Sequence, residues 1–287
     1  MGASTLLESQ HPPRRAMPAF TRLPCPLPGI DIVSADSARA FPRHIHDEFG
    51  IGRIDRGAQK TASGRGMVQS VAGDVITVNP GEVHDGLPLG DHGRAWRMLY
   101  LSPDVVGGLV ADIAEGRGTG DVEFHLPTLH DDRVAGRFEA LFRAMAATPL
   151  DAADTLQVDG ALILLLQSLL QPRAADLPAI PAGIAIARSR LDDDLTAPVS
   201  LADLARDAGL SRFQFLRGFT RATGLPPHAY LVQRRLQHAR RLIAIGTPLA
   251  DASAASGFFD QSHLTRHFVR CFGIAPGAYA AALRRAR

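Results

Sequence analysis

The sequence has few of the residues that cross-link a protein or anchor it in a membrane. Only two of its 287 residues are cysteine, Cys25 and Cys271, so at most one disulfide could form and a disulfide-rich fold is excluded. The longest apolar run, 161–166, is far shorter than the ~20 residues that a membrane-spanning helix requires. The first residues lack the continuous apolar core of a signal peptide. We therefore expect no membrane segment.

Lysine is scarce too: Lys60 is the only one, and we interpret the excess of arginine as a base-composition bias of the source. The charges are nevertheless distributed unevenly. Residues 184–287 hold 15 Arg and seven Asp but no Lys or Glu, a net charge of +8, whereas residues 1–183 carry −6. A basic segment joined to an acidic one predicts a polyanionic partner for the basic segment.

An internal repeat lies in the basic segment. The window 216–230, LRGFTRATGLPPHAY, aligns without a gap with the window 265–279, TRHFVRCFGIAPGAY, and seven of the fifteen positions are identical. The two windows start 49 residues apart, and a chance match of that density is improbable. We therefore expect a structural unit that occurs twice.

Each copy has the pattern of a helix-turn-helix. A short helical pattern precedes each window and ends at a glycine, Gly209 or Gly257, which takes left-handed dihedrals at little cost. Ser211 and Asp260 can then cap the next helix. Small residues, Ala205 and Ser253, stand four positions before each glycine, where the two helices must approach closely. The sequence thus predicts two units of helix, glycine turn and helix.

The second helix of each unit has one apolar and one basic face. The pairs Phe215/Phe219 and Leu264/Phe268 are spaced to point inward, and an arginine then points outward in each copy. Arg, Gln, Ser and His can reach base edges and phosphates in the major groove. An ordinary solvated surface is the alternative, but the repeat and the positive charge favour nucleic-acid binding.

A single helix is expected between the two units, at 226–246. Some 18 residues would span ~27 Å, comparable to the ~34 Å of one turn of B-DNA. Such a rod could hold two recognition helices over successive major-groove segments on one face of a duplex.

At these residues the sequence resembles the AraC/XylS family of bacterial transcription regulators. The resemblance covers about 184–279 and rests on AxxAGLS in the first unit, GFxDQSHLTRHF in the second and the FG…P…Y ending. In that family the second helix of each unit reads DNA. The resemblance implies that role here for Arg212, Phe213, Gln214, Arg217, Gln261, Ser262, His263, Thr265 and Arg266, with Arg270 beside them. Leu216 stands where a polar reader could be, so the first helix would depend more on shape and methyl contacts.

The residues from 29 to 101 have a different pattern, with short apolar runs separated by glycine-containing turns. The turns fall at 55–57, 63–66, 72–74 and 79–81. Strands of about five residues with tight turns predict a small antiparallel barrel or sandwich. Residues 1–20 are rich in Pro, Ser and Arg without periodicity, and we expect a mobile arm there.

Histidines and a carboxylate gather at two places in this region. His44, His46 and Glu48 would share one face of a strand, because side chains alternate in strands, and a barrel could bring His84 opposite them. Such a group could bind a transition metal, hold a polar organic ligand or pair internally as part of the structure.

The stretch 73–84, GDVITVNPGEVH, resembles the second motif of cupin barrels, and the two His of 44–48 match the first motif in part. The cupin carboxylate would fall near Gly50 rather than at Glu48, and Ala38 stands where that motif has glycine. These departures weaken a metal site. We therefore expect the four side chains to line the pocket of an organic effector, with no cofactor, and a metal at the three His is the alternative.

Two amphipathic helices are expected next, at 131–147 and 154–170, followed by a proline-rich linker. The predicted fold is α+β: an N-terminal antiparallel cupin-like barrel with two following helices, then an all-α domain whose two helix-turn-helix units are joined by a long helix. The predicted segments are the arm (1–20), a sensing and dimerisation domain (21–171), the linker (172–183) and a DNA-binding domain (184–287) with units at about 201–222 and 249–271.

Two functions compete. One is a ligand-responsive transcription regulator, and the other is a metal-dependent cupin enzyme with a DNA-binding tail. The displaced cupin carboxylate and the lack of a convincing nucleophile or carboxylate pair argue against the enzyme. The resemblance implies a cytoplasmic protein with duplex DNA and a small-molecule effector as partners, acting as a homodimer, and RNA polymerase is a further candidate partner.

Overall fold

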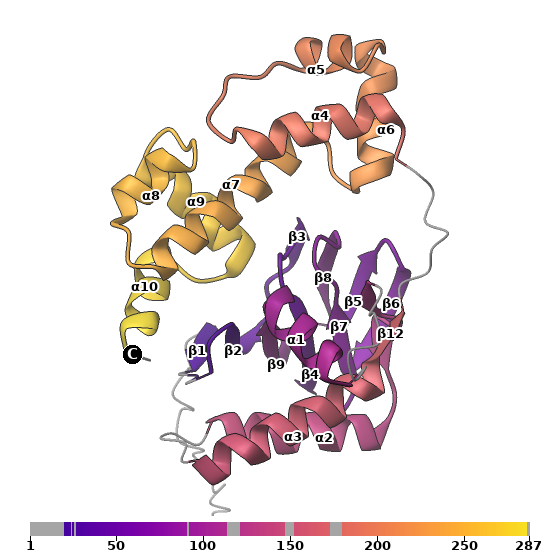
Figure 1. Cartoon of the computed structure of the whole chain (residues 1–287), viewed down its shortest axis with the longest axis vertical. Helices are drawn as coiled ribbons and strands as arrows, with labels where there is room; N and C mark the ends of the chain where they lie inside the picture. Colours follow the sequence, from indigo (N-terminus) through magenta and orange to yellow (C-terminus); the bar gives the residue numbers. More distant parts are fainter. Residues whose placement is uncertain are drawn as a thin grey trace, which may run out of the picture.

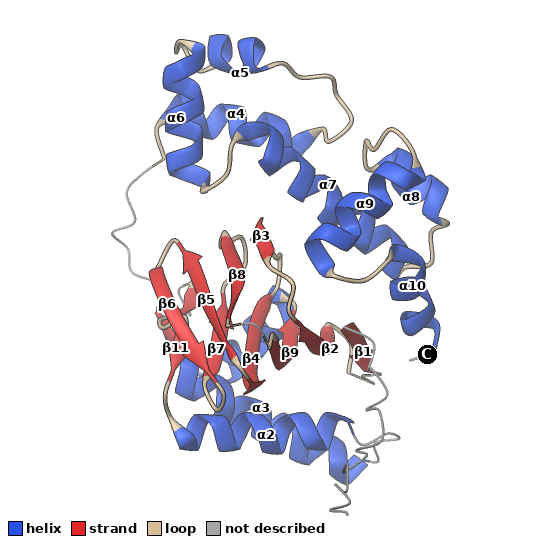
Figure 2. Cartoon of the chain, turned by 180° about the vertical axis from the view of Figure 1, so that it is seen from behind, coloured by secondary structure: helices blue, strands red, loops and turns tan. Residues whose placement is uncertain are grey.

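The computed structural model describes residues 20–23, 25, 27–90, 92–113, 121–146, 152–172 and 180–285. All the described strands lie between residues 20 and 172, with three helices among them, and residues 182–285 are helical, which confirms the predicted α+β order (Figure 1). The C-terminal helices lie next to the side of the sheets where β3 and β8 are found. Helices α2 and α3 lie on the opposite side of the sheets (Figure 2).

The N-terminal domain contains two main antiparallel sheets and a short third one. The strands are β1 (Phe20–Leu23), β2 (Ile30–Ser37), β3 (Phe41–His44), β4 (Phe49–Arg56), β5 (Ala58–Ser63), β6 (Gly66–Val71), β7 (Val75–Val78), β8 (His84–Leu89), β9 (Arg94–Leu101), β10 (Val122–Phe124), β11 (Thr128–Leu129) and β12 (Leu170–Pro172). The larger sheet has the order β1-β2-β9-β4-β7-β11, the second has β3-β8-β5-β6, and β10 pairs with β12.

The predicted turns each separate two of these strands. The turn 55–57 ends at Gly57, whose φ of 76° is in the left-handed region, and a Cβ there would lie 2.3 Å from the carbonyl oxygen of Gly93. No other residue type fits both conditions. The turn chemistry therefore placed the strands β4 to β7 correctly from the sequence.

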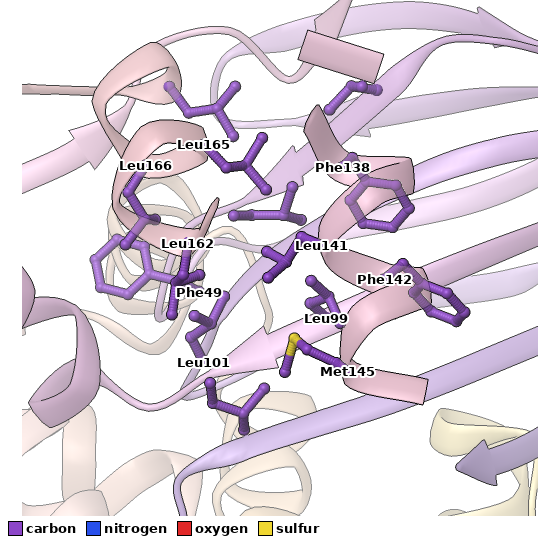
Figure 3. Close-up of a cluster of buried hydrophobic side chains, with 14 of the residues drawn as sticks. Phe49, Leu99, Leu101, Phe138, Leu141, Phe142, Met145, Leu162, Leu165 and Leu166 are labelled. Carbon is purple, nitrogen blue, oxygen red and sulfur yellow. The ribbon is translucent and has the colours of Figure 1, made fainter. Parts of the chain in front are cut away.

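The larger sheet separates two apolar cores because its side chains alternate. On β9, Leu99 and Leu101 face the helices, whereas Trp96 and Met98 face the second sheet. Helices α1 (Pro103–Ile113), α2 (Asp132–Ala146) and α3 (Ala152–Leu169) cover the first side. Figure 3 shows the resulting core, in which aromatic and aliphatic side chains of α2 and α3 pack on the sheet.

The C-terminal domain is formed by α4 (Ala182–Asp193), α5 (Leu201–Asp207), α6 (Arg212–Thr223), α7 (Pro227–Ala244), α8 (Leu249–Ala255), α9 (Gln261–Phe272) and α10 (Pro276–Arg285). Its predicted capping is present. The Ser211 hydroxyl accepts from the N–H of Gln214 in a capping box, and the Asp260 carboxylate accepts from the N–H of His263. These bonds fix where the second helix of each unit begins.

Each helix-turn-helix unit has its own core, and α7 contributes to both. Phe215 and Phe219 are fully buried in the first unit, and Leu264 and Phe268 are fully buried in the second, as their spacing predicts. The small residues before each turn are buried as well. The long helix α7 is therefore a shared structural rod and not a solvated linker.

The structure also differs from the sequence predictions. Strands β1, β2, β3, β8, β10, β11 and β12 were not singled out, and β12 ends at Pro172, the first residue of the expected linker. The expected strand through 44–48 is wrong: β3 ends at His44, and residues 45–48 are a loop with a bend at Asp47 and Glu48. The predicted arm, 1–20, lies outside the described residues except for Phe20, which begins β1.

Within the described part of the chain, none of the helices combines the length and the apolar character that crossing a membrane would require.

The two turn glycines allow a matched test of stability. Gly209 has a φ of 67° and open space where a Cβ would lie, whereas at Gly257, with a φ of 75°, a Cβ would lie 2.6 Å from the Leu195 carbonyl oxygen. Gly209→Ala should lower the free energy of unfolding by about 1–2 kcal/mol, the cost of a left-handed alanine. Gly257→Ala should lower it further because of the clash. Urea unfolding of both variants checks the order, and equal losses would contradict it.

Candidate functional site

The first recognition helix, α6, exposes its N-terminal half. Arg212, Phe213, Gln214 and Arg217 are all exposed, and the guanidinium of Arg217 lies over the Phe213 ring at 5.5 Å from its centroid. Phe213 is 66% exposed. The side-chain oxygen of Gln214 accepts from the N–H of Ser211, so this residue also helps to cap the helix. These four residues therefore form an exposed surface, and its two guanidiniums take part in none of the ion pairs found among the described residues.

The second recognition helix, α9, presents a similar surface. Gln261, Ser262, Arg266 and Arg270 are exposed. His263 and Thr265 are half-buried: the imidazole of His263 packs against His267 with ring centroids 4.8 Å apart, and the Thr265 hydroxyl donates to the Gln261 carbonyl at 2.8 Å. These last two are therefore less available to a ligand than the other four.

Sequence reasoning missed one exposed aromatic beside α9. Phe259 directly precedes the capping residue and is 92% exposed, the highest value among the large apolar residues described. The exposure of Phe213 at the start of α6 makes the two units alike in this respect. An apolar ring beside basic side chains can contact thymine methyl groups. The sequence GFFD, 257–260, could have indicated this exposure. Two adjacent phenylalanines in a turn cannot both be buried in the core, and here Phe258 is buried and Phe259 is not.

The second candidate site is a cavity of about 150 Å³ between the two sheets and the C-terminal helices. Its walls come from both domains. The lining residues from the N-terminal domain include Val33, Phe41, His44, His46, Gln59, Ile76, His84, Arg94, Trp96, Met98 and Tyr100, and those from the C-terminal domain are Arg240, Cys271, Phe272, Ile274 and Tyr279. A molecule bound there would contact both domains at once.

Three of the four predicted ligand residues meet in this cavity. His44, His46 and His84 have ring centroids 4.4–5.3 Å apart and are almost fully buried. Nδ1 of His44 lies 2.8 Å from the Pro42 carbonyl and Nδ1 of His84 lies 3.1 Å from the Glu82 carbonyl. Because a carbonyl only accepts, these nitrogens carry the proton, and Nε2 of both rings is the acceptor.

Burial keeps this cluster uncharged. Desolvation lowers the pKa of His44 to about 3, aided by the neighbouring His84, and lowers the pKa of His84 to about 4. The pKa of His46 is also well below its usual value, first because of burial and then because of the other two imidazoles. Three neutral imidazoles therefore offer lone pairs to the cavity at neutral pH.

The predicted fourth member, Glu48, does not join the cluster. Its carboxylate forms an ion pair with Arg240 of α7, because the bend after His46 turns the side chain toward the helices. One ligand nitrogen from each His lies within 4.8 Å of those of the other two, which fits three imidazole ligands of a zinc-like ion. Glu48 would not complete the set, so a fourth ligand would have to come from outside these residues.

The loop that follows the His pair connects the cavity to the helical domain. The Ile45 carbonyl accepts from Gln237 Nε2 at 2.7 Å, and the Asp47 carboxylate pairs with Arg234 at 2.9 Å and with Arg241 at 2.7 Å. All three partners are on α7. The loop that begins after His44 is therefore bonded directly to the rod that both helix-turn-helix units share.

Comparison with protein families matches both halves of the chain. The AraC-like ligand binding domain matches residues 27–166, and a helix-turn-helix domain matches residues 204–282. The chain belongs to the AraC family of transcriptional regulators. It is therefore a transcriptional regulator with an N-terminal ligand-binding domain and a C-terminal DNA-binding domain.

A sequence relative of this AraC-family chain supports the same assignment, and two solved structures share its fold. The HTH-type transcriptional regulator YbfI of Bacillus subtilis is 27% identical over 231 residues, which are 78% of this chain and 81% of YbfI. The fold is similar to that of apo ToxT from Vibrio cholerae, with a TM-score of 0.53, 15% identity and coverage of 89% of this chain and 98% of ToxT. A second ToxT structure, with an unsaturated fatty acid bound, has a TM-score of 0.52, 14% identity and coverage of 88% and 94%.

Acid should destabilise the regulator through its His cluster. Each imidazole has a folded pKa below the unfolded value of 6.5, so the unfolded chain binds more protons. The stability from the neutral cluster is complete above about pH 6.5 and is lost as the pH falls toward about 4, by up to ~1.4 kcal/mol per pH unit for each His. The urea unfolding free energy should fall less steeply in His84→Gln. The exposed His125→Gln is the control, and equal slopes in all three proteins would contradict this assignment.

Proposed function

We propose that this regulator reads duplex DNA with the exposed faces of α6 and α9 and changes its DNA binding when a small molecule enters the cavity. The observation that supports DNA reading most directly is the repeat, because both copies expose an arginine at the same position, Arg217 and Arg266, opposite their buried Phe pair or Leu-Phe pair. The other predicted readers that are exposed surround these two: Arg212, Phe213, Gln214, Gln261, Ser262 and Arg270. His263 and Thr265 are proposed as backbone or edge contacts.

The cavity supports the effector half of the proposal. It is lined by the predicted residues His44, His46 and His84 and by side chains of α7, α9 and α10. A ligand regulates only if it binds two conformations with different affinity, and a site built from two domains meets that requirement whenever the domains move. ToxT, which shares the fold, has been solved with an unsaturated fatty acid bound. Glu48 is proposed to act through Arg240 and not by direct contact.

The protein's environment and assembly also belong to the proposal. We expect a cytoplasmic homodimer, and α3 supports the dimer because Leu156 and Leu164, two turns apart, are 74% and 51% exposed. Contact with RNA polymerase is a further expectation of the family. An enzymatic role has weak support, since the relatives are transcriptional regulators and Glu48 is engaged by Arg240.

The base-reading role of the two repeated arginines can be tested in the full chain. Arg266→Ala should relax the preference at one base position and weaken specific binding by about 1–3 kcal/mol, if the side chain makes a bidentate contact to guanine. Arg217→Ala should do so about one helical turn away. DNA selected from a random pool gives the preferences, and Arg143→Ala, on the exposed side of α2, is the control. Equal losses on specific and random DNA would show phosphate contacts only.

The link between cavity and rod can be tested at Asp47. Asp47→Asn removes the negative charge that two guanidiniums of α7 share. Because all three groups are partly solvent-exposed, the free energy of unfolding should fall by about 1 kcal/mol. Hydrogen exchange of the amides in α7 should become faster, whereas Asp36→Asn, which breaks the surface pair with Arg56, should leave α7 unchanged. Unaltered exchange in Asp47→Asn would show that this contact does not hold the rod.

A further inference from the structure

We propose that the cavity binds an apolar carboxylate and that Arg94 is the residue that receives its anionic group. This inference rests on the proposed use of the cavity as an effector site, and it adds the chemical class of the ligand and the residue that recognises its charge.

Arg94 is buried inside the N-terminal domain, at the start of β9. Its side chain is 1% exposed. Nε donates to Gln59 Oε1 at 2.7 Å, and the two terminal nitrogens donate to the carbonyls of Arg39 at 3.1 Å and Gly86 at 3.2 Å. All three acceptors are neutral. A guanidinium has five N–H groups, so these bonds leave donors for a further acceptor.

The charge of Arg94 has no partner among the described residues. The other two cavity arginines are paired, Arg22 with Asp31 and Arg240 with Glu48. Asp85 also lines the cavity, but its carboxylate accepts from the Ala62 N–H at 2.7 Å and forms no ion pair with Arg94. Burial lowers the pKa of Arg94 to about 10, which still leaves the group charged at neutral pH. A buried cation without a counter-charge is costly, and a bound anion would remove that cost.

The side chains around Arg94 favour a ligand that has one negative charge and is otherwise apolar. Its guanidinium lies 4.5 Å from the Trp96 ring centroid and 5.6 Å from that of Phe41. Rings stack on the faces of a guanidinium, whereas its N–H groups lie in the plane, so a carboxylate can bind without disturbing the stacking. The adjoining walls are apolar, with Val33, Ile76 and Met98. One cation matches a carboxylate better than a phosphate dianion.

The fluorescence of Trp96, the single tryptophan of the chain, can report binding, because its ring lies against the guanidinium of Arg94. The full-length protein is titrated with octanoate and 4-phenylbutyrate and, in parallel, with octanol and 4-phenylbutanol, while tryptophan emission is followed. The carboxylates should give a saturable change, and the alcohols should bind at least ~10-fold more weakly, as expected for loss of a hydrogen-bonded charge pair. Equal binding of acid and alcohol, or no saturable response to either acid, would overturn the proposal.

Two variants then locate the charge contact. Arg94→Gln should weaken both carboxylates at least ~10-fold and leave the alcohols unchanged, and Arg94→Lys should recover part of the loss. Arg143→Gln, whose side chain is 75% exposed, is the control. Unchanged carboxylate binding in a folded Arg94→Gln would place the anion elsewhere and overturn the assignment. If the variants fail to fold, the comparison of acid with alcohol in the wild-type protein still decides. A gel shift of the wild-type protein on selected DNA tests the proposed function separately.

Discussion

Loop 45–48 packs on α7, and both halves of the molecule depend on this contact. The Ile45 side chain is buried in the core of the first helix-turn-helix unit, and its carbonyl accepts from the buried Gln237. Asp47 and Glu48 follow at once and pair with arginines of the same helix. One loop thus supplies an apolar anchor, a backbone acceptor and two charges to the rod between the DNA-reading units. His44 directly precedes this loop and His46 lies within it, so the loop joins the cavity wall to the rod.

The sensing domain also touches both recognition helices at equivalent positions of the repeat. Gly224 ends α6 and Gly273 ends α9, each in the left-handed conformation. A Cβ at Gly224 would lie 2.9 Å from Val83, and one at Gly273 would lie 2.5 Å from a ring carbon of Phe20. Val83 precedes His84 of the cluster, and Phe20 lines the cavity. The N-terminal domain therefore contacts the C-terminal end of both α6 and α9 and leaves the N-terminal half of each helix exposed.

Features that depend on neighbouring residues could be predicted from the sequence, and those that depend on distant partners could not. The capping residues, turn glycines and apolar pairs of the helical units act within a few positions, so the pattern was sufficient. The meeting of His84 with His44 followed from the predicted barrel, whose short strands and tight turns are local features of the sequence. Glu48 was placed wrongly with the imidazoles because its partner, Arg240, lies 192 positions away. Arg94 was missed, since arginine is rarely buried and its three acceptors come from separate segments of the chain.

The distribution of ion pairs shows what kind of regulation this arrangement permits. The acidic groups of the barrel that reach the basic domain pair with Arg234, Arg240 and Arg241, all on α7. The exposed arginines of α6 and α9 take part in none of the ion pairs found among the described residues. The arginines that hold the two domains together are therefore different from the exposed arginines that could contact DNA phosphates. The contact between the domains therefore leaves the charges of these exposed arginines unpaired among the described residues, and Arg270 lines a surface hollow together with Phe41 and Leu87 of the N-terminal domain.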